Sequence, residues 1–411
     1  MLKNSLIFFN IHYFAVRNFI MYIIEVTNKQ TEEEFIFASV IINKNTPNYI
    51  RPLDKEIKDI FNPSTNKNFK HGTAKRWVLK DEAHELIGRI ASFTNTKYIN
   101  KGTDFLTGGI GFFESINQQK VANLLFDTAK NWLQEQGMQA MDGPINFGDR
   151  DKYWGLMVEG FDKEPVYGMP FNPSYYQKLF ENYGFKNYYN QYWFSMSVDD
   201  DLPSRFQERY HKFKSKPGYS ARHVESNQLD KYANDFATVY NTAWAQHGEA
   251  KAITKEEVEK LFKTMKPIMD ERVIWFAYYK EEPIAMFINI PDVNQYFKHF
   301  NGKLTLINKL RLLWMKKMMK RKKLTGLVFG VVPKYQALGI DSFLIQSCGY
   351  FMQHKNWYDS YEMGWAGDWN PKMHNIYKSL GGTQSRRMVT YRFIFNENEF
   401  PFERHPIMDY N

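Results

Sequence analysis

Hydrophobic positions along the chain follow two spacings, and the switches between them mark the predicted elements. In the first half, an alternation of period two predicts strands at Tyr22–Thr27, Arg76–Leu79, Glu85–Thr94, Gly108–Glu114, Gln139–Gly143 and Asn187–Val198. A helical spacing predicts helices at 30–42, 118–136 and 173–183. Strands that alternate with helices indicate an α/β fold in which helices flank a sheet.

The second half repeats this plan after an acidic linker at 199–203. Strands are predicted at Tyr219–Glu225, Val273–Tyr279, Pro283–Ile290, Leu324–Val332, Ser360–Trp365 and Arg386–Phe395. Helices are predicted at 229–245, 254–269, 339–353 and 371–380. We therefore expect two similar domains, at 22–200 and 201–411, each a mixed and mostly antiparallel sheet flanked by helices.

Two matched segments support an internal duplication. Asn172–Phe185 and Asn370–Gly382 each begin with a capping residue followed by proline, and each reaches a glycine where the helix should end. Because both segments follow the same order of strands, their similarity suggests two copies of one unit.

Residues 1–21 are expected to form an N-terminal extension. Ser5–Ile24 is apolar enough to suggest a membrane anchor, but Asn10, His12, Arg17 and Asn18 interrupt it. An upstream extension or a docked tail is therefore favoured over a membrane span.

Charge and cysteine content narrow the partners and the compartment. The chain of 411 residues has 54 Lys and Arg against 45 Asp and Glu, a formal charge of +9 that favours anionic partners. Its single cysteine, Cys348, excludes an intrachain disulfide and a Cys-based metal cluster, and lies in an apolar helical pattern typical of a buried thiol. We expect a cytoplasmic protein with no metal and no DNA partner.

Several motifs resemble the GNAT acyltransferase superfamily in a tandem bacterial form, over roughly residues 22–395. The segments that carry this resemblance are Gly88–Ile90, Gly111–Glu114, Asp142–Asn146, Gly155–Phe161 and Asn172-Pro173. Gln336-Ala337-Leu338-Gly339-Ile340-Asp341 resembles the family's coenzyme A motif, preceded by Val331, Val332 and Lys334. The resemblance implies tandem GNAT-like (acyl-CoA N-acyltransferase) domains and acetyl-CoA or acyl-CoA as the donor.

The chemistry of a helix N-terminus supports a pyrophosphate site at this turn, independently of the family resemblance. A strand would deliver the chain to a helix N-terminus, whose free amides attract a pyrophosphate, and Gly339 would permit close backbone approach. Asp341 departs from the family pattern because it brings a negative charge near the phosphates. In the first copy the matching turn, Glu114–Gln119, has no glycine, so we place the cofactor in the second copy only.

By position in the family, Tyr377 is the expected proton donor to the leaving thiolate, although it could equally be a packing aromatic. Asn370 is a candidate cofactor-binding residue that is expected to cap its helix, with or without touching the pantetheine arm. Glu362 is a candidate general base, with a structural salt bridge as the alternative. Backbone groups at Val331 and Val332 could pair with the pantetheine amides and polarise the thioester carbonyl.

Leu304–Lys323 is apolar and ends in the cations of Lys316–Lys323. We expect a packed helix whose C-terminal charges complement its dipole. The alternative is a docking surface for an acyl carrier protein, anionic lipid or tRNA. Aromatic residues at 188–194 and 365–369 could line a cleft between the copies, or simply pack.

The functional expectation is N-acyl transfer to an amine of a small molecule or peptide. Two alternatives remain open: an aminoacyl-tRNA-dependent transferase, which some tandem GNAT-like proteins resemble, and a non-catalytic binding protein.

Overall fold

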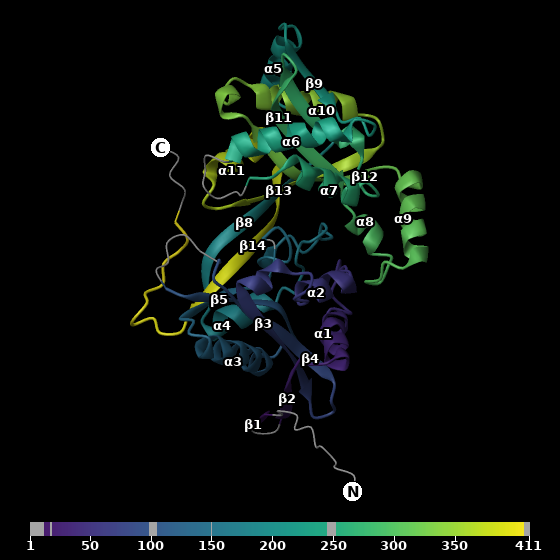
Figure 1. Cartoon of the computed structure of the whole chain (residues 1–411). Coiled ribbons are helices and arrows are strands. Elements are labelled where there is room, and N and C mark those ends of the chain that lie inside the picture. The colour runs from purple at the N-terminus through teal and green to yellow at the C-terminus, as the bar shows by residue number, and fades with distance from the viewer. Residues whose placement is uncertain (1–11, 17–18, 98–104, 149, 245–251, 407–411) are drawn as a thin grey trace.

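A computed structural model describes residues 12–16, 19–97, 105–148, 150–244 and 252–406 of the chain. Figure 1 shows two α/β halves, one above the other, joined by two long strands. We call residues 12–200 the N-terminal half and residues 201–406 the C-terminal half. Among the described residues, no helix combines the length and apolar character needed to cross a membrane.

The N-terminal half contains the strands β1 (His12–Val16), β2 (Phe19–Glu25), β3 (Gly72–Asp81), β4 (Leu86–Asn95), β5 (Thr107–Ser115), β6 (Ala140–Gly143), β7 (Leu156–Glu159) and β8 (Lys186–Ser197). Its helices are α1 (Lys29–Ile42), α2 (Asp54–Ile60), α3 (Gln119–Glu135) and α4 (Tyr176–Tyr183). β1 pairs antiparallel with β2, so part of the predicted extension adds a strand to the sheet; residues 1–11 and 17–18 lie outside the described residues.

The C-terminal half contains the strands β9 (Tyr219–His223), β10 (Ile274–Tyr279), β11 (Glu282–Pro291), β12 (Lys322–Val331), β13 (Tyr358–Gly367) and β14 (Thr383–Ile394). Its helices are α5 (Ser204–Lys214), α6 (Leu229–Trp244), α7 (Lys255–Met265), α8 (Asn294–Phe297), α9 (Leu306–Met318), α10 (Ile340–Met352) and α11 (Pro371–Ser379).

All these strands belong to one sheet, in the order β1-β2-β3-β4-β5-β6-β14-β8-β13-β12-β11-β10-β9, with β7 also paired to β14. Only β5–β6 and β12–β13 are parallel among its described pairs, so the predicted mixed and mostly antiparallel character is confirmed. β8 lies beside β13 of the other half, and β14 lies beside β6. The halves therefore exchange their last strands across the junction.

Helices cover both faces of each half. In the C-terminal half, α5, α10 and α11 contribute to a buried cluster on one face, and α6 and α7 contribute to another cluster. In the N-terminal half, α3 and α4 pack in one cluster while α1 and α2 pack in another. This arrangement places α10 and α11 together on the face where the predicted turn begins.

Several sequence expectations differ from the structure. No element was predicted at β1, β7, α2 or α8. No helix was predicted at α5. The helix predicted over Leu304–Lys323 ends at Met318, and Lys322 and Lys323 begin β12 instead. Asn172 does not cap α4, which begins at Tyr176, because its side chain instead accepts a hydrogen bond from the Met157 N–H and donates to the Met157 carbonyl.

Candidate functional site

The predicted turn lies at the mouth of a cleft beside the start of α10. Gly339 is the N-cap of this helix and has a φ of 95°, a left-handed conformation that favours glycine. The cleft has a volume of about 390 Å³. Its lining comes from α5, the turn, α10 and α11: Arg205, Phe206, Arg209, Ala337, Gly339, Asp341, Ser342, Asn375, Ile376 and Ser379. We call this space the turn cleft.

Two arginines from α5 give the turn cleft a positive wall. A Cβ atom added to Gly339 would lie 2.7 Å from Cδ of Arg209, so the absence of a side chain lets Arg209 pack onto the turn. The Arg205 guanidinium donates to the Ser379 carbonyl at 2.9 Å, which ties α5 to the end of α11. Guanidinium groups next to a helix N-terminus are well suited to binding a phosphate.

These arginines were missed by the sequence reasoning. The available signal was the helical spacing of Phe206 and Phe213, which are buried on α5, with Arg205 and Arg209 one turn apart.

The other predicted residues of the turn have varied positions. Gln336 donates to the Val331 carbonyl at 3.0 Å, and the Val332 N–H donates to the Ile284 carbonyl at 2.9 Å, so these groups hold the turn together. The Lys334 ammonium lies 5.7 Å from the centroid of the Tyr335 ring. Of the remainder, Leu338 is exposed and Ile340 is buried, while Ala337 and Asp341 lie on the wall of the turn cleft.

Tyr377 and a second tyrosine, Tyr361, lie where β12 and β13 part. The ladder between these strands runs only from Lys322 to Thr325 on β12. Beyond it, a Cβ on Gly326 would lie 2.6 Å from the Tyr361 hydroxyl, and a Cβ on Gly364 would lie 3.8 Å from the Tyr377 hydroxyl. Two glycines thus leave room for two hydroxyl groups at the opening in the sheet.

Both tyrosine hydroxyls are held in the protonated form at neutral pH. Burial raises the pKa of Tyr377 above its usual range and is also the largest cause of the raised pKa of Tyr361. A protonated hydroxyl at this opening can donate a hydrogen bond or a proton. The sequence signal for the opening was a glycine inside each of the two strands.

Glu362 lies beside the same opening but is engaged by neighbours. Its carboxylate accepts hydrogen bonds from the Ser385 hydroxyl and from Arg386 Nη1, the latter at 2.6 Å. A carboxylate bonded to a buried guanidinium is held in place by a charge-assisted hydrogen bond. Asn370 accepts from the Met373 N–H at 3.1 Å, so its predicted capping role is confirmed.

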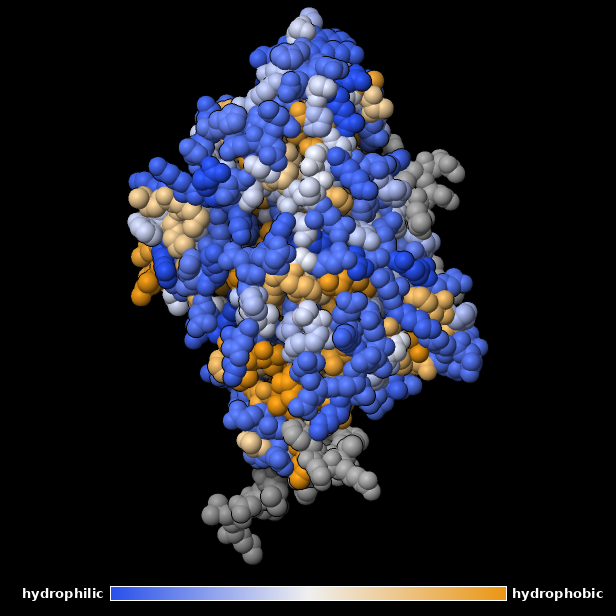
Figure 2. All heavy atoms as spheres, turned by 180° about the vertical axis from the view of Figure 1, so that it is seen from behind, coloured by the Kyte–Doolittle hydropathy of each residue, from blue (hydrophilic) through white to orange (hydrophobic). Residues whose placement is uncertain are grey.

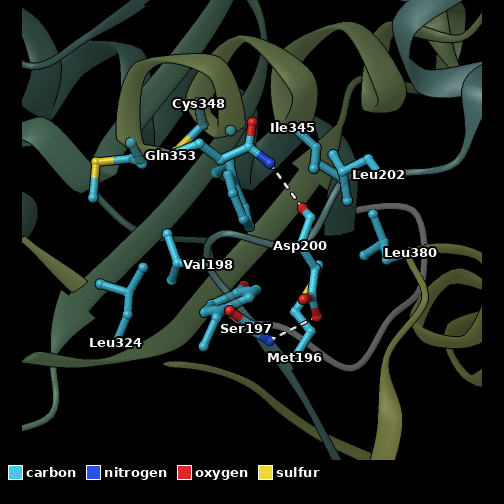
Figure 3. Close-up of a pocket in the computed structure, with 14 residues that line it drawn as sticks. Met196, Ser197, Val198, Asp200, Leu202, Leu324, Ile345, Cys348, Gln353 and Leu380 are labelled. Atoms are coloured by element: carbon cyan, nitrogen blue, oxygen red, sulfur yellow. Dashed lines mark hydrogen bonds between the residues drawn. The ribbon is translucent and has the colours of Figure 1, made fainter. Parts of the chain in front are cut away.

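An apolar cavity lies further along α10. It has a volume of about 70 Å³, several times the roughly 10–15 Å³ that one water needs. Figure 3 shows its lining side chains converging from α10, β8, β12 and the end of α11. The lining residues are Met196, Ser197, Val198, Asp200, Leu202, Phe287, Leu324, Ile345, Cys348, Gly349, Met352, Gln353, Tyr361 and Leu380.

The polar groups around this apolar cavity are already hydrogen-bonded or carry no charge. The Gln353 side chain donates to the Asp200 carbonyl at 2.8 Å. Burial raises the pKa of the Cys348 thiol to about 12, which keeps it protonated and confirms the expectation of a buried, unreactive cysteine. The cavity therefore suits an alkyl chain better than a polar group.

The equivalent region of the N-terminal half is a small cavity of about 80 Å³ whose lining includes Glu114 and Tyr176. Glu114, at the end of β5, accepts hydrogen bonds from Ser39, Asn43, Arg89 and the Tyr176 hydroxyl at 2.8–3.2 Å. The Ser115 N–H, at the start of the turn, donates to the same Tyr176 hydroxyl at 3.0 Å. The groups that could face a cofactor are thus already bonded within the protein.

Two known proteins are similar in sequence to most of the chain. The chain is 26% identical over 373 residues to a protein of Caulobacter vibrioides named bacterial ceramide synthase, covering 90% of this chain and 96% of that one. It is 24% identical over 371 residues to protein YghO of Escherichia coli, covering 89% and 93% of the two chains. No protein-family model matches the chain.

Solved structures show the same fold. A tandem GNAT protein from the clavulanic acid biosynthesis pathway superposes with a TM-score of 0.52 at 10% identity, over 91% of this chain and 98% of its own. A fungal multi-domain β-N-acetylglucosaminidase with a GCN5-related glucosamine N-acetyltransferase region also gives a TM-score of 0.52, at 12% identity. That match covers 91% of this chain but only 38% of the fungal protein. The predicted tandem GNAT fold is confirmed.

Proposed function

We propose that this tandem GNAT-fold protein is an acyl-coenzyme-A-dependent N-acyltransferase whose acceptor is a long-chain amine. One observation carries the proposal: α10 lines a cationic cleft at its first turn and an apolar cavity one turn further on. Ser342 lies on the cleft and Ile345 on the cavity. A ligand with an anionic head and an alkyl chain matches this sequence of environments.

The donor site would be the turn cleft. Arg205, Arg209 and the free amides at the start of α10 would hold the pyrophosphate, with Gly339 letting Arg209 pack beside those amides. The pantetheine arm would then run toward the opening between β12 and β13, where the hydroxyls of Tyr361 and Tyr377 lie.

The acyl group and the acceptor are inferred from the cavity together with one relative. A ceramide is the amide of a fatty acid with a long-chain amino alcohol, and a relative of nearly equal length is named for its synthesis. The apolar cavity would accept the alkyl chain of the donated acyl group, because burying methylene groups there removes them from water.

The reaction joins the amine nitrogen to the thioester carbonyl carbon. The C–N bond forms, the C–S bond breaks, the amine loses a proton and the departing thiolate gains one. Tyr377 or Tyr361, both protonated, would supply a proton or a hydrogen bond at the thiolate. Because Glu362 is paired with Arg386, we assign it a positioning role rather than that of the base.

Calorimetry with coenzyme A tests the donor site. Arg209→Glu places a negative charge on the cleft wall and should weaken binding at least about tenfold, a loss of about 1.4 kcal/mol. Lys212→Glu, a change of the same charge on an exposed position of the same helix, should bind like the wild type. Absence of binding by the wild type, or equal affinities for the two variants, would refute the donor assignment.

Gly349 offers a test of the apolar cavity. A Cβ at this position meets nothing closer than 3.8 Å, so a methyl group can be added without a clash. Gly349→Leu should fill the cavity and lower transfer from palmitoyl-CoA to sphinganine at least about tenfold, with transfer from acetyl-CoA retained. Gly349→Ala, the control, should keep both activities. Equal palmitoyl transfer by both variants would argue against an alkyl site here.

A further inference from the structure

Helix α9 exposes most of its large apolar side chains. Leu306 is 74% exposed, Ile307 77% and Trp314 63%, and Leu310, Leu313 and Met318 are all more than half exposed. These six side chains define the outer face of α9. Such a continuous row is uncommon on a monomeric protein surface unless a partner covers it. The sequence expectation of a packed helix is therefore wrong for this face.

The outer face is a continuous stripe on one side of the helix. At about 3.6 residues per turn, its six positions fall within an arc of roughly 140°. Leu312 and Met315 lie on the opposite side and are buried in a cluster with Tyr296 and Phe300. The helix is thus anchored through one stripe and presents the other outward.

The figures show where this face lies on the molecule. α9 stands at the edge of the molecule beside α8, outside the layers that cover the sheet (Figure 1). Seen from behind, apolar side chains gather on that same edge, with hydrophilic surface around them (Figure 2). The outer face of α9 therefore lies at the periphery of the molecule.

Positive charge is concentrated around α9. The segment Val293–Lys323 contains eight lysines and two arginines and no Asp or Glu. It carries +10, so the rest of the chain sums to −1, since the whole chain carries +9. Lys309 and Arg311 flank the outer face, and Lys317 lies within it near the C-terminal end. A long lysine stem can lie on an apolar surface while its charge reaches phosphate groups.

We propose that α9 docks this protein on the surface of an anionic lipid bilayer. The outer face would enter the boundary between head groups and acyl chains, with the helix axis parallel to the membrane plane. Trp314 suits that boundary, and the surrounding cations match anionic phosphates. Nucleic acid offers the cations a partner but gives the exposed leucines and isoleucine no apolar surface to cover them. This docking does not depend on the reaction proposed above.

Vesicle flotation of the full-length protein tests the docking. Wild type should float with vesicles of phosphatidylcholine and phosphatidylglycerol, and much less with phosphatidylcholine alone, and high salt should weaken the association. Leu310→Asp combined with Trp314→Asp should lower the vesicle-bound fraction at least about tenfold. Because both positions are exposed, thermal unfolding should match that of the wild type.

Leu261→Asp provides the matched control. Leu261 is an exposed leucine, 41% accessible, on the different helix α7. This variant should float like the wild type. The proposal is overturned if wild type does not bind anionic vesicles, or if the α9 double variant binds them as well as wild type does. It is also overturned if the double substitution abolishes binding to tRNA or to an acidic acyl carrier protein while vesicle binding persists.

Discussion

Asp341 lies on the wall of the turn cleft together with Arg205 and Arg209. It is in the first turn of α10, where an acidic residue favours the helix dipole but opposes an incoming phosphate. The N-cap is Gly339, which has no side chain, and Asp341 makes no capping contact there. The helix N-terminus thus carries both the amides that attract an anion and a carboxylate that repels it.

Asp341→Ala should therefore strengthen coenzyme A binding. Removal of one partly exposed like charge should lower the dissociation constant about threefold. Calorimetry at low and moderate salt would show the gain shrinking as salt rises. Glu33→Ala removes an exposed carboxylate on α1 of the N-terminal half and should leave the affinity unchanged. Weaker binding by Asp341→Ala would mean that the carboxylate helps to hold the ligand.

Asp292 is a buried carboxyl group at the junction of the halves. Its Oδ1 accepts from the Tyr167 N–H at 2.9 Å and from the Asn294 N–H at 3.2 Å. Burial is the largest cause that raises the pKa of Asp292 to about 7, against about 3.9 in an unfolded chain. Between about pH 4 and pH 7 the folded state therefore holds a proton that the unfolded state has released.

The contribution of Asp292 to stability should accordingly fall as pH rises through this window. Asp292→Asn keeps an oxygen acceptor and removes the titration, so the variant should gain stability relative to wild type between about pH 4 and pH 7. One unit of pKa difference corresponds to about 1.4 kcal/mol, so the total gain would be on the order of 4 kcal/mol. Thermal unfolding at several pH values would measure it, and parallel curves for the two proteins would contradict it.

Among the elements, β14 is held to β6 by a fully buried ion pair. Arg392 Nε and Nη2 each lie 2.7 Å from one Asp142 carboxylate oxygen, and neither side chain is exposed. The Arg392 guanidinium carbon also lies 3.6 Å from the centroid of the Tyr188 ring on β8. This contact thus joins three neighbouring strands contributed by the two halves.

Asp142→Ala should destabilise the protein by about 3–5 kcal/mol, because it leaves a buried arginine without its charge partner. Urea unfolding would measure the loss. The neighbouring exposed pair, Lys186–Glu397, is the control, since both side chains are nearly half exposed. Glu397→Ala should change the stability by about 0–1 kcal/mol. Similar losses in both variants would show that burial does not set the energy of these pairs.

The sequence was a good guide to elements with strong local signals. The helices at 118–136 and 371–380 were predicted because their apolar spacing and end signals are regular. α5 was missed because only Phe206, Tyr210 and Phe213 interrupt a polar stretch after the acidic linker. With α5 unpredicted, Arg205 and Arg209 could not be placed at the cleft.

Two further features required three-dimensional information. A local pattern identifies a strand but not its neighbours, so the exchange of β8 and β14 between the halves could not be predicted. For α9, the spacing predicted a helix rich in apolar residues. Which of its two apolar stripes would be covered depends on Tyr296 and Phe300, residues outside the helix itself.

For the whole molecule, the strand exchange makes the halves depend on each other for folding. β14 adds a partner to β6 and β7 of the N-terminal half, and β8 lies between β13 and β14. A chain cut after residue 200 would leave β8 without either neighbour. In the C-terminal fragment, β13 and β14 would both lack their neighbour β8. The backbone groups that pair with β8 in the intact chain would be left unpaired.

We therefore expect a fragment ending at residue 200 and a fragment beginning at residue 201 to fail to fold separately. Each would lack a cooperative thermal transition, whereas the intact chain would unfold in a single transition. Mixed or co-expressed fragments should recover helical and strand signals by circular dichroism, since each supplies the strand that the other lacks. A cooperative transition in either isolated fragment would show that one half closes its sheet without the exchanged strand.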